Sequence, residues 1–263
     1  MKILVTVVER ATVDDEFELD GTRIDDQCLT YDLNEWDSYA LEEAVQFGET
    51  HDDVEVVTAT VGPERTEETI RQALAKGADR AVRVWGDALD ETEILGPGTK
   101  ARLLGAVARE EEPGLVLSGI QTGDNAFGAT GVALASLLGY EWAAVVNSLD
   151  VDPEVGVARV HRELEGGVEE LTDVELPAVF TVQTGLNEPR YASLRGIRQA
   201  QNRPLEVRSP ADLGLAATDA RSALSVDSLY EPETESDVTL FEGDAEESAG
   251  DLAALLEEKG VEA

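Results

Sequence analysis

The sequence predicts an α/β protein built on a mainly parallel sheet that is sandwiched by helices. In its first half, short apolar strands alternate with segments of helical periodicity four times, which is typical of a parallel sheet covered by helices on both faces. The fourth strand, Leu115–Leu117, runs into a glycine-rich loop and then into a helix from about Gly128. Such a loop offers free N–H groups and the positive end of a helix dipole to an anion. It is therefore either an anion site or an ordinary strand-to-helix turn.

Each element of the first half has a local signal. β-branched residues mark the first strand, Asn34 is a good N-cap for the first helix, and Gly62-Pro63 ends the second strand. Gly77 is expected to cap the end of the second helix. The polar stretch 13–30 predicts an irregular arm or a hairpin. The expected strands are 3–8, 54–61, 81–84 and 115–117, and the expected helices are 34–47, 64–77, 98–112 and 128–139.

The second half changes character. Four strand-like segments separated by turns at Asp152-Pro153 and Gly166-Gly167 predict a partly antiparallel extension of the same sheet. These segments are 143–151, 155–163, 168–174 and 178–184, and they are followed by a short helix over 193–203, an extended arm over 213–240 and a terminal helix over 249–259. We expect a nucleotide-binding α/β domain over 1–207. Residues 208–263 then form an arm and short helix that pack on a partner subunit, or else a mobile acidic tail.

The charge and composition of the chain limit the classes of function that it can have. Asp and Glu number 56 against 20 Lys and Arg, and this excess is spread along the chain, giving a net charge of −36. Self-repulsion of this size is relieved in molar salt, where the Debye length is ~3 Å, so we expect a protein of a salt-rich cytoplasm. The lack of basic patches argues against nucleic acid. One cysteine and two histidines argue against a metal site. No apolar run approaches ~20 residues, so we expect no membrane insertion.

Several residues outside the loop fall at or just beyond the carboxyl ends of expected strands, where parallel sheets bind ligands. They are Thr6, Asn34 and Gly62, and they converge with the loop Gly119–Thr130. This convergence favours a nucleotide site over a plain turn. Neither a Walker lysine nor a G-x-G-x-x-G pattern is present.

One stretch carries a resemblance to a known family. LNEPRYASLRGIRQAQNRPLEV at 186–207, preceded by LPAVFTVQT at 176–184, resembles the β subunit of electron-transfer flavoproteins. The resemblance covers most of residues 1–207. Further blocks agree in order and spacing: Asn34 followed by ALEEA at 40–44, GPE at 62–64, ALAKGADRAVRV at 73–84, EPGLVLSGIQ at 112–121 and ELEGG at 163–167.

The resemblance implies a fold of the adenine-nucleotide α-hydrolase-like, Rossmann-like kind. It also implies a heterodimer with an α subunit that holds most of one FAD, while the β subunit buries an AMP. The loop at Asp124–Thr130 departs from the family pattern, so a second FAD, as in electron-bifurcating relatives, is the alternative to AMP. The residues expected to line this pocket are Thr6, Asn34, Gly62, Gly119, Gln121, Asp124, Gly128, Ala129 and Thr130.

The resemblance also implies a role. Such a subunit carries electrons from dehydrogenases, such as acyl-CoA dehydrogenases, to a quinone oxidoreductase and needs no catalytic residue of its own. Glu163 matches a glutamate near the flavin, unless it is only a solvated carboxylate. Leu194 matches the leucine that docks on partner dehydrogenases, unless it packs in the core. We expect Tyr191, Leu194, Arg195 and Arg198 to recognise partners. The alternative function is a stand-alone adenine-nucleotide-binding hydrolase or sensor, which would have no use for residues 186–203.

Overall fold

A seven-stranded sheet forms the centre of the computed structural model, which describes residues 1–90, 92–231, 238–241 and 243–260. Its strand order is β14-β7-β6-β1-β8-β13-β9, and every neighbouring pair is parallel. The predicted α/β class is therefore confirmed. The strands are β1 (Lys2–Thr6), β6 (Glu55–Val61), β7 (Arg80–Val84), β8 (Leu115–Gly119), β9 (Glu141–Val146), β13 (Ala178–Val182) and β14 (Leu205–Arg208).

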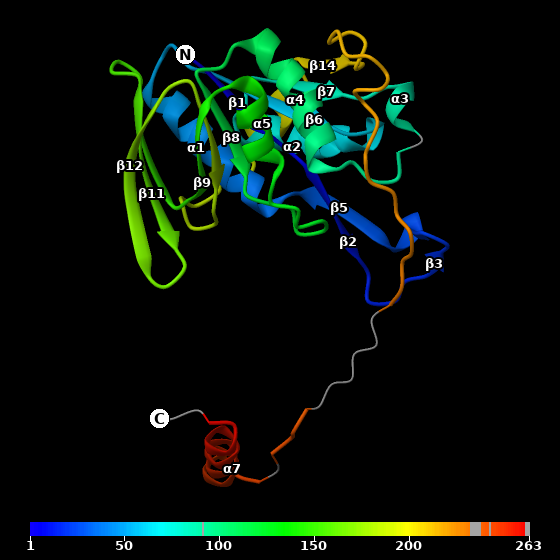
Figure 1. The fold of residues 1–263 in the computed structure, drawn as a ribbon, viewed down its shortest axis with the longest axis vertical. Coiled ribbons are helices and arrows are strands. Elements are labelled where there is room, and N and C mark those ends of the chain that lie inside the picture. Colours follow the sequence, from blue (N-terminus) through cyan, green and yellow to red (C-terminus); the bar gives the residue numbers. More distant parts are fainter. Residues whose placement is uncertain (91, 232–237, 242, 261–263) are drawn as a thin grey trace. The chain divides into compact units, whose positions relative to one another are not determined.

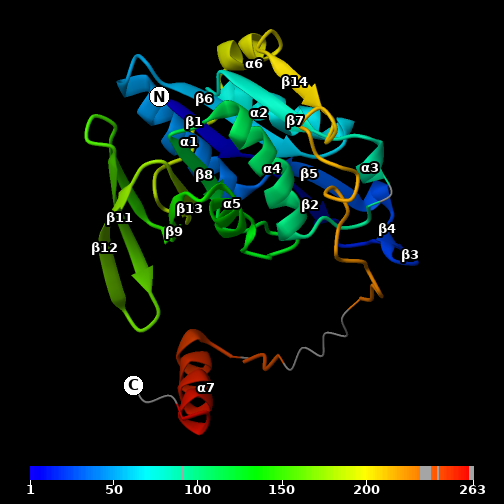
Figure 2. The ribbon, with the colours of Figure 1, turned by 45° about the horizontal axis from the view of Figure 1, so that its top comes forward.

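Helices cover both faces of this sheet (Figures 1 and 2). Alternate residues of β1 show why the strand is a continuous apolar run. Ile3 and Val5 pack into one cluster with α1 and α2, whereas Leu4 packs into a second cluster with α4 and α5. The helices are α1 (Glu35–Thr50), α2 (Glu67–Lys76, after a 3₁₀ turn at Glu64–Thr66), α4 (Pro97–Glu111) and α5 (Thr130–Leu138), with the short α3 at Asp87–Asp90. Gly77 caps α2 with φ 137°, as predicted.

The antiparallel strands do not extend the central sheet, which corrects the sequence-based expectation. β10 (Ser148–Asp152), β11 (Val157–Leu164) and β12 (Val168–Glu175) form a sheet of their own. The predicted strand over 143–151 breaks where the chain changes sheets, because Val146 O accepts from Gln183 N while Asn147 N donates to His161 O. β9 and β13 instead run parallel in the central sheet.

The region after β1 folds as a hairpin, one of the two predicted forms. β2 (Glu9–Val13) pairs antiparallel with β5 (Leu29–Leu33), and between them lie β3 (Leu19–Asp20), β4 (Arg23–Ile24) and a 3₁₀ turn at Asp26–Cys28. Asn34 occupies the N-cap position of α1, but its side chain makes no cap hydrogen bond. Its Nδ2 donates to Gln121 O at 2.9 Å instead, so it ties α1 to the glycine-rich loop.

The chain divides into two compact units, Met1–Ser228 and Leu229–Ala263. Residues 209–228, which follow β14, belong to the first unit, where Arg102 Nε donates to Asp219 O and Ala220 is buried. In the second unit, α7 (Ala245–Glu258) begins four residues before the predicted helix because Asp244 and Glu247 form a capping box. Part of the predicted arm, residues 232–237, lies outside the described residues. None of the described helices has the length and apolar character needed to span a bilayer.

Candidate functional site

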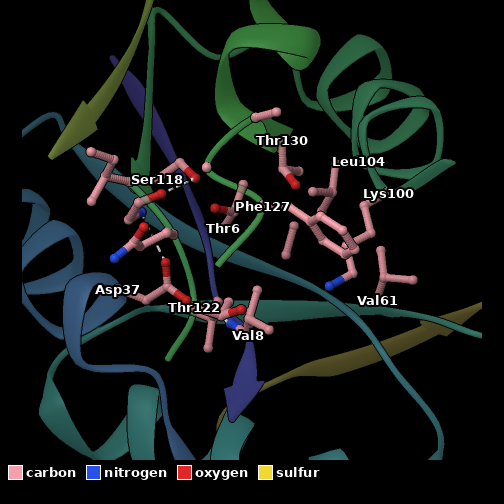
Figure 3. A pocket seen from close by; sticks show the side chains of 17 residues that line it. Thr6, Val8, Asp37, Val61, Lys100, Leu104, Ser118, Thr122, Phe127 and Thr130 are labelled. Atoms are coloured by element: carbon pink, nitrogen blue, oxygen red, sulfur yellow. Dashed lines mark hydrogen bonds between the residues drawn. The ribbon is translucent and has the colours of Figure 1, made fainter. Parts of the chain in front are cut away.

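A cleft opens where the order of strands along the central sheet reverses. From β1 the chain moves to β6 and β7 on one side and then crosses back to β8 on the other side of β1. Ligands of parallel sheets bind at such a switch point, beyond the carboxyl ends of the strands. The cleft lies there, between Thr6–Val8 at the end of β1, Ser118–Gly119 at the end of β8, and Ala59 of β6 (Figure 3).

The cleft is narrow and partly apolar. The volume open to the centres of water molecules is about 40 Å³, against about 580 Å³ of empty space when its mouth is included. An occupant larger than a few waters must therefore widen the cleft or lie partly in its mouth. Leu104, Val61 and the half-exposed Phe127 form its apolar side.

Asp37 joins the two strand ends that form the walls. Its Oδ2 accepts from Val8 N at 2.9 Å, and its Oδ1 accepts from Gly119 N at 2.9 Å. Burial raises the pKa of Asp37 to about 7, against the lowering effect of these two N–H donors. A Cβ at Gly119 would lie 2.6 Å from Asp37 Oδ1, so glycine is required for this close approach. Asp37 therefore sets the spacing between β1 and the loop.

The start of α5 supplies free hydrogen-bond donors. The N–H groups of Thr130, Gly131 and Val132 have no acceptor among the described residues, and Ala129 offers no side-chain cap. The Thr6 side chain is only 3% exposed, and its hydroxyl, which faces the cleft, bonds to no described residue. Unpaired donors of this kind, buried beside a cleft, suit an anionic ligand.

The structure brings most of the predicted pocket residues together. Asn34 does not line the cleft but contacts Gln121 of the glycine-rich loop, and its Oδ1 is buried with no hydrogen-bond partner among the described residues. Gly62 and Asp124 line a wider groove beside the cleft, with a volume open to water of about 720 Å³. The predicted residues that line the cleft itself are Thr6, Gly119, Gln121, Gly128, Ala129 and Thr130.

Sequence reasoning missed Asp37, Lys100 and Phe127, which also line the cleft. Lys100 comes from α4 and borders the wider groove as well. Burial lowers the pKa of Lys100, and the charges of Asp124 and Asp37 act against that lowering. One signal was available in the sequence: Lys100 is one of only four lysines in the chain.

The predicted recognition residues lie on an exposed segment that is firmly held. Tyr191 is 97% exposed, and Leu194, the first residue of α6 (Leu194–Ala200), is 79% exposed. Arg195 and Arg198 are exposed on the same short helix. Beneath it, Arg71 Nη1 of α2 donates to Ala200 O at 2.7 Å. Hereafter residues 186–203 are called the docking segment, after the partner recognition that the sequence predicts for them.

Glu163 lies near the end of β11, opposite Glu169 of β12. It is exposed, and its N–H donates to Asn147 Oδ1 at 3.1 Å. Glu163 is therefore accessible to solvent in the single chain, and it is not among the residues that line the switch-point cleft.

The parallel sheet and its switch-point cleft define an α/β protein of the nucleotide-binding type, and comparison with known proteins makes the assignment specific. Residues 22–213 match the model of the electron transfer flavoprotein domain. The chain is 45% identical to the electron transfer flavoprotein subunit β of Methylophilus methylotrophus, over 98% of both chains. It is 38% identical to the human subunit β, over 92% of this chain and 90% of that one, and 38% identical to the mitochondrial subunit β of Oryza sativa subsp. japonica, over 88% and 90%. The chain belongs to the family of electron transfer flavoprotein β subunits, which confirms the resemblance seen in the motifs.

Proposed function

We propose that this chain is the β subunit of a heterodimeric electron carrier. It receives electrons from dehydrogenases, such as acyl-CoA dehydrogenases, and passes them to a quinone oxidoreductase. The observation that carries the proposal is the similarity to β subunits along practically the whole chain, at 45% identity over 98% of both sequences. The FAD is held mainly by the α subunit, and its isoalloxazine ring supplies the redox chemistry. This chain supports the flavin, with Glu163 facing the subunit boundary.

The switch-point cleft is proposed to hold AMP as a structural ligand. Its donor set fits a phosphate, since α5 presents three free N–H groups and Thr6 and Thr130 add hydroxyls. Gly119 and Gly131 leave no room for a side chain at the wall: a Cβ at Gly131 would meet Thr181 Cγ2 at 2.5 Å. A nucleotide there would fasten β1, β8 and α5 together at the open end of the sheet.

The docking segment is proposed to recognise partner dehydrogenases. Leu194 and Tyr191 expose apolar surface on a segment whose backbone is tied down, a combination typical of interface anchors. Arg195 and Arg198 place positive charge beside them in a chain of net charge −36. This arrangement suits an apolar pocket with an acidic rim on the partner.

Residues 208–263 are proposed to pack on the α subunit, and the whole complex is proposed to work in a salt-rich cytoplasm. In α7, Leu252 and Leu256 are 45% and 42% exposed and lie four residues apart, so they form one apolar stripe. Such a stripe on a helix of the second compact unit offers a surface to a partner subunit. The spread of acidic residues over the chain supports the salt-rich setting.

The test is co-expression with the neighbouring α-type gene product in high salt, followed by electron transfer from a candidate dehydrogenase. The proposal predicts a co-purifying complex whose flavin is reduced by the dehydrogenase. Leu194→Ala should lower kcat/KM for that step by about tenfold or more without loss of flavin. Leu137→Ala, which changes an exposed leucine on α5, is the matched control and should leave the rate unchanged. If the chain instead purifies as a stable monomer that hydrolyses ATP, the electron-carrier function is wrong.

A further inference from the structure

We propose that the Lys100 ammonium binds the phosphate of the nucleotide in the switch-point cleft and makes the site selective for a phosphorylated nucleotide over the nucleoside. The inference rests on the proposed function, which places AMP in this cleft. It adds a specificity-determining residue on α4, outside the glycine-rich loop.

Lys100 is placed where a bound anion would lie. It is the fourth residue of α4 (Pro97–Glu111), and it lines both the cleft and the wider groove at its mouth. Figure 3 shows its side chain extending into the cleft beside Val61 and Phe127. Thr130, at the start of α5, lines the same cleft. Lys100 of α4 and Thr130, whose N–H group is free at the start of α5, thus border one space from two helices.

Lys100 forms no direct ion pair with any carboxylate that the structure describes. Among the described residues, Lys100 takes part in none of the ion pairs with N–O distances up to 4 Å, although the charges of Asp124 and Asp37 are near enough to influence its pKa. Burial lowers the pKa of Lys100, which means that the protein surroundings disfavour its charge. A half-buried cation is normally paired, so an anion from outside the chain is the natural partner.

Lys100 is also the only basic residue among those that line the cleft. The loop Gly119–Thr130 contains no lysine or arginine. Asp37 borders the cleft and Asp124 the groove at its mouth, so both oppose the entry of an anion, as does the net charge of −36. Neutral N–H and O–H donors can orient a phosphate, but among the residues that line the cleft only Lys100 carries a positive charge that offsets it; Arg23 and Arg65 line the wider groove instead.

A structural role is the rival explanation. Lys100 would then serve only to balance Asp37 and Asp124 and so hold the loop in shape. Loss of Lys100 would then weaken the binding of a nucleoside and of a nucleotide by the same factor, because both ligands use the same cleft. The proposal predicts a loss confined to the phosphorylated ligand, so the two roles give different results.

The experiment compares AMP with adenosine as titrants, by calorimetry, on the complex of the full chain with its α-type partner after removal of bound nucleotide. Lys100→Met should weaken the binding of AMP by about 10- to 100-fold, which is the usual effect of losing a hydrogen bond to a charged group. The affinity for adenosine should change by less than about twofold. Lys100→Arg keeps the charge and should retain most of the selectivity. Lys76→Met is the matched control, because burial also lowers the pKa of Lys76 but it lies on α2, away from the cleft.

Three results would contradict the proposal. If the Lys100→Met variant binds AMP with the affinity of the wild type, Lys100 does not contact the phosphate. An equal loss of AMP and adenosine, restored by Lys100→Arg, assigns Lys100 to the structural role. Wild-type protein that binds neither titrant overturns the placement of a nucleotide in this cleft as well, and so separates failure of the proposed function from failure of Lys100.

Discussion

Arg190 fixes the docking segment to α1, and its removal gives a prediction whose size follows from burial. Arg190 Nε donates to Glu42 Oε2 at 2.8 Å and Nη1 donates to Glu49 Oε1 at 2.6 Å. The Arg190 backbone N–H also donates to Glu42 Oε2, at 3.1 Å. The Glu42 side chain is 5% exposed, the Arg190 side chain 31% and the Glu49 side chain 58%. The pair with Glu42 is therefore buried, whereas the pair with Glu49 is largely at the surface.

Arg190→Met should release the docking segment, while Glu42→Gln should not. The first change leaves a buried carboxylate without its cation, which costs about 3–5 kcal/mol. The second leaves Arg190 with water and Glu49, and it leaves an amide at position 42 that can still bond Gln46, so the cost is about 1 kcal/mol or less. Glu49→Gln should likewise cost about 1 kcal/mol or less, because that carboxylate is exposed and screened.

The loss in Arg190→Met should also depend on pH. Burial raises the pKa of Glu42, but hydrogen bonds from Arg190 and Gln46 outweigh it and hold the pKa below its ordinary value of 4.5. A carboxyl with a lowered folded-state pKa stabilises the fold above pH 4.5 and loses that contribution as the pH falls through the folded-state value. The deficit of Arg190→Met relative to wild type should therefore be largest near neutral pH and shrink in acid.

The assay is tryptic cleavage after Arg195 and Arg198, which are exposed on α6. If the segment must open before cleavage, a 3–5 kcal/mol loss raises the cleavage rate about 100- to 1,000-fold or more. Equal rates in Arg190→Met and Glu42→Gln, or wild-type protection in Arg190→Met, would refute the reasoning from burial.

Three other predictions follow from single contacts and from charge. Burial raises the pKa of Asp37 from 3.8 to about 7, so the folded protein loses stability when this carboxyl ionises. As the pH rises from 4 to 7, the unfolding free energy of the wild type should fall by up to roughly 4 kcal/mol relative to that of Asp37→Asn. Urea titrations at several pH values measure both free energies, and a difference between the two proteins that does not change with pH would contradict the prediction. Gly131→Ala should cost about 1–3 kcal/mol in thermal unfolding, because its Cβ would meet Thr181 at 2.5 Å, whereas Gly250→Ala in α7 has open space and should lose nothing. The melting temperature should rise between 0.1 and 2 M KCl, and a fall would count against the salt-rich setting.

The central sheet and its helices could be predicted because their signals are local. Ile3–Val5 and Leu115–Leu117 are apolar runs that suit a sheet buried on both faces, and Gly77 ends α2 in a conformation that favours glycine. β14 was not predicted, because Leu205–Arg208 has only four residues, two of them charged, and lies at the edge of the sheet. The separate antiparallel sheet was missed for another reason: which strands pair is decided by tertiary contacts.

The cleft was predictable in position but not in full. The expected strand ends and the glycines of the loop predicted that Thr6 and the loop 119–130 lie beside one another, and both contribute residues to the cleft. Asp37 escaped notice because its partner Gly119 is 82 residues away, and nothing local to α1 reveals that contact. Lys100 escaped notice because a lysine near the start of a helix is normally solvated; only the packing of α4 against the cleft makes it unusual.

The most direct test of the central claim is a count of the nucleotides released when the purified complex of this chain and its α-type partner is denatured. The proposed function predicts one FAD and one AMP per heterodimer, separated and quantified by chromatography. Two FAD and no AMP would replace the structural AMP with a second flavin and favour electron bifurcation. The absence of both complex and flavin would contradict the electron-carrier function itself.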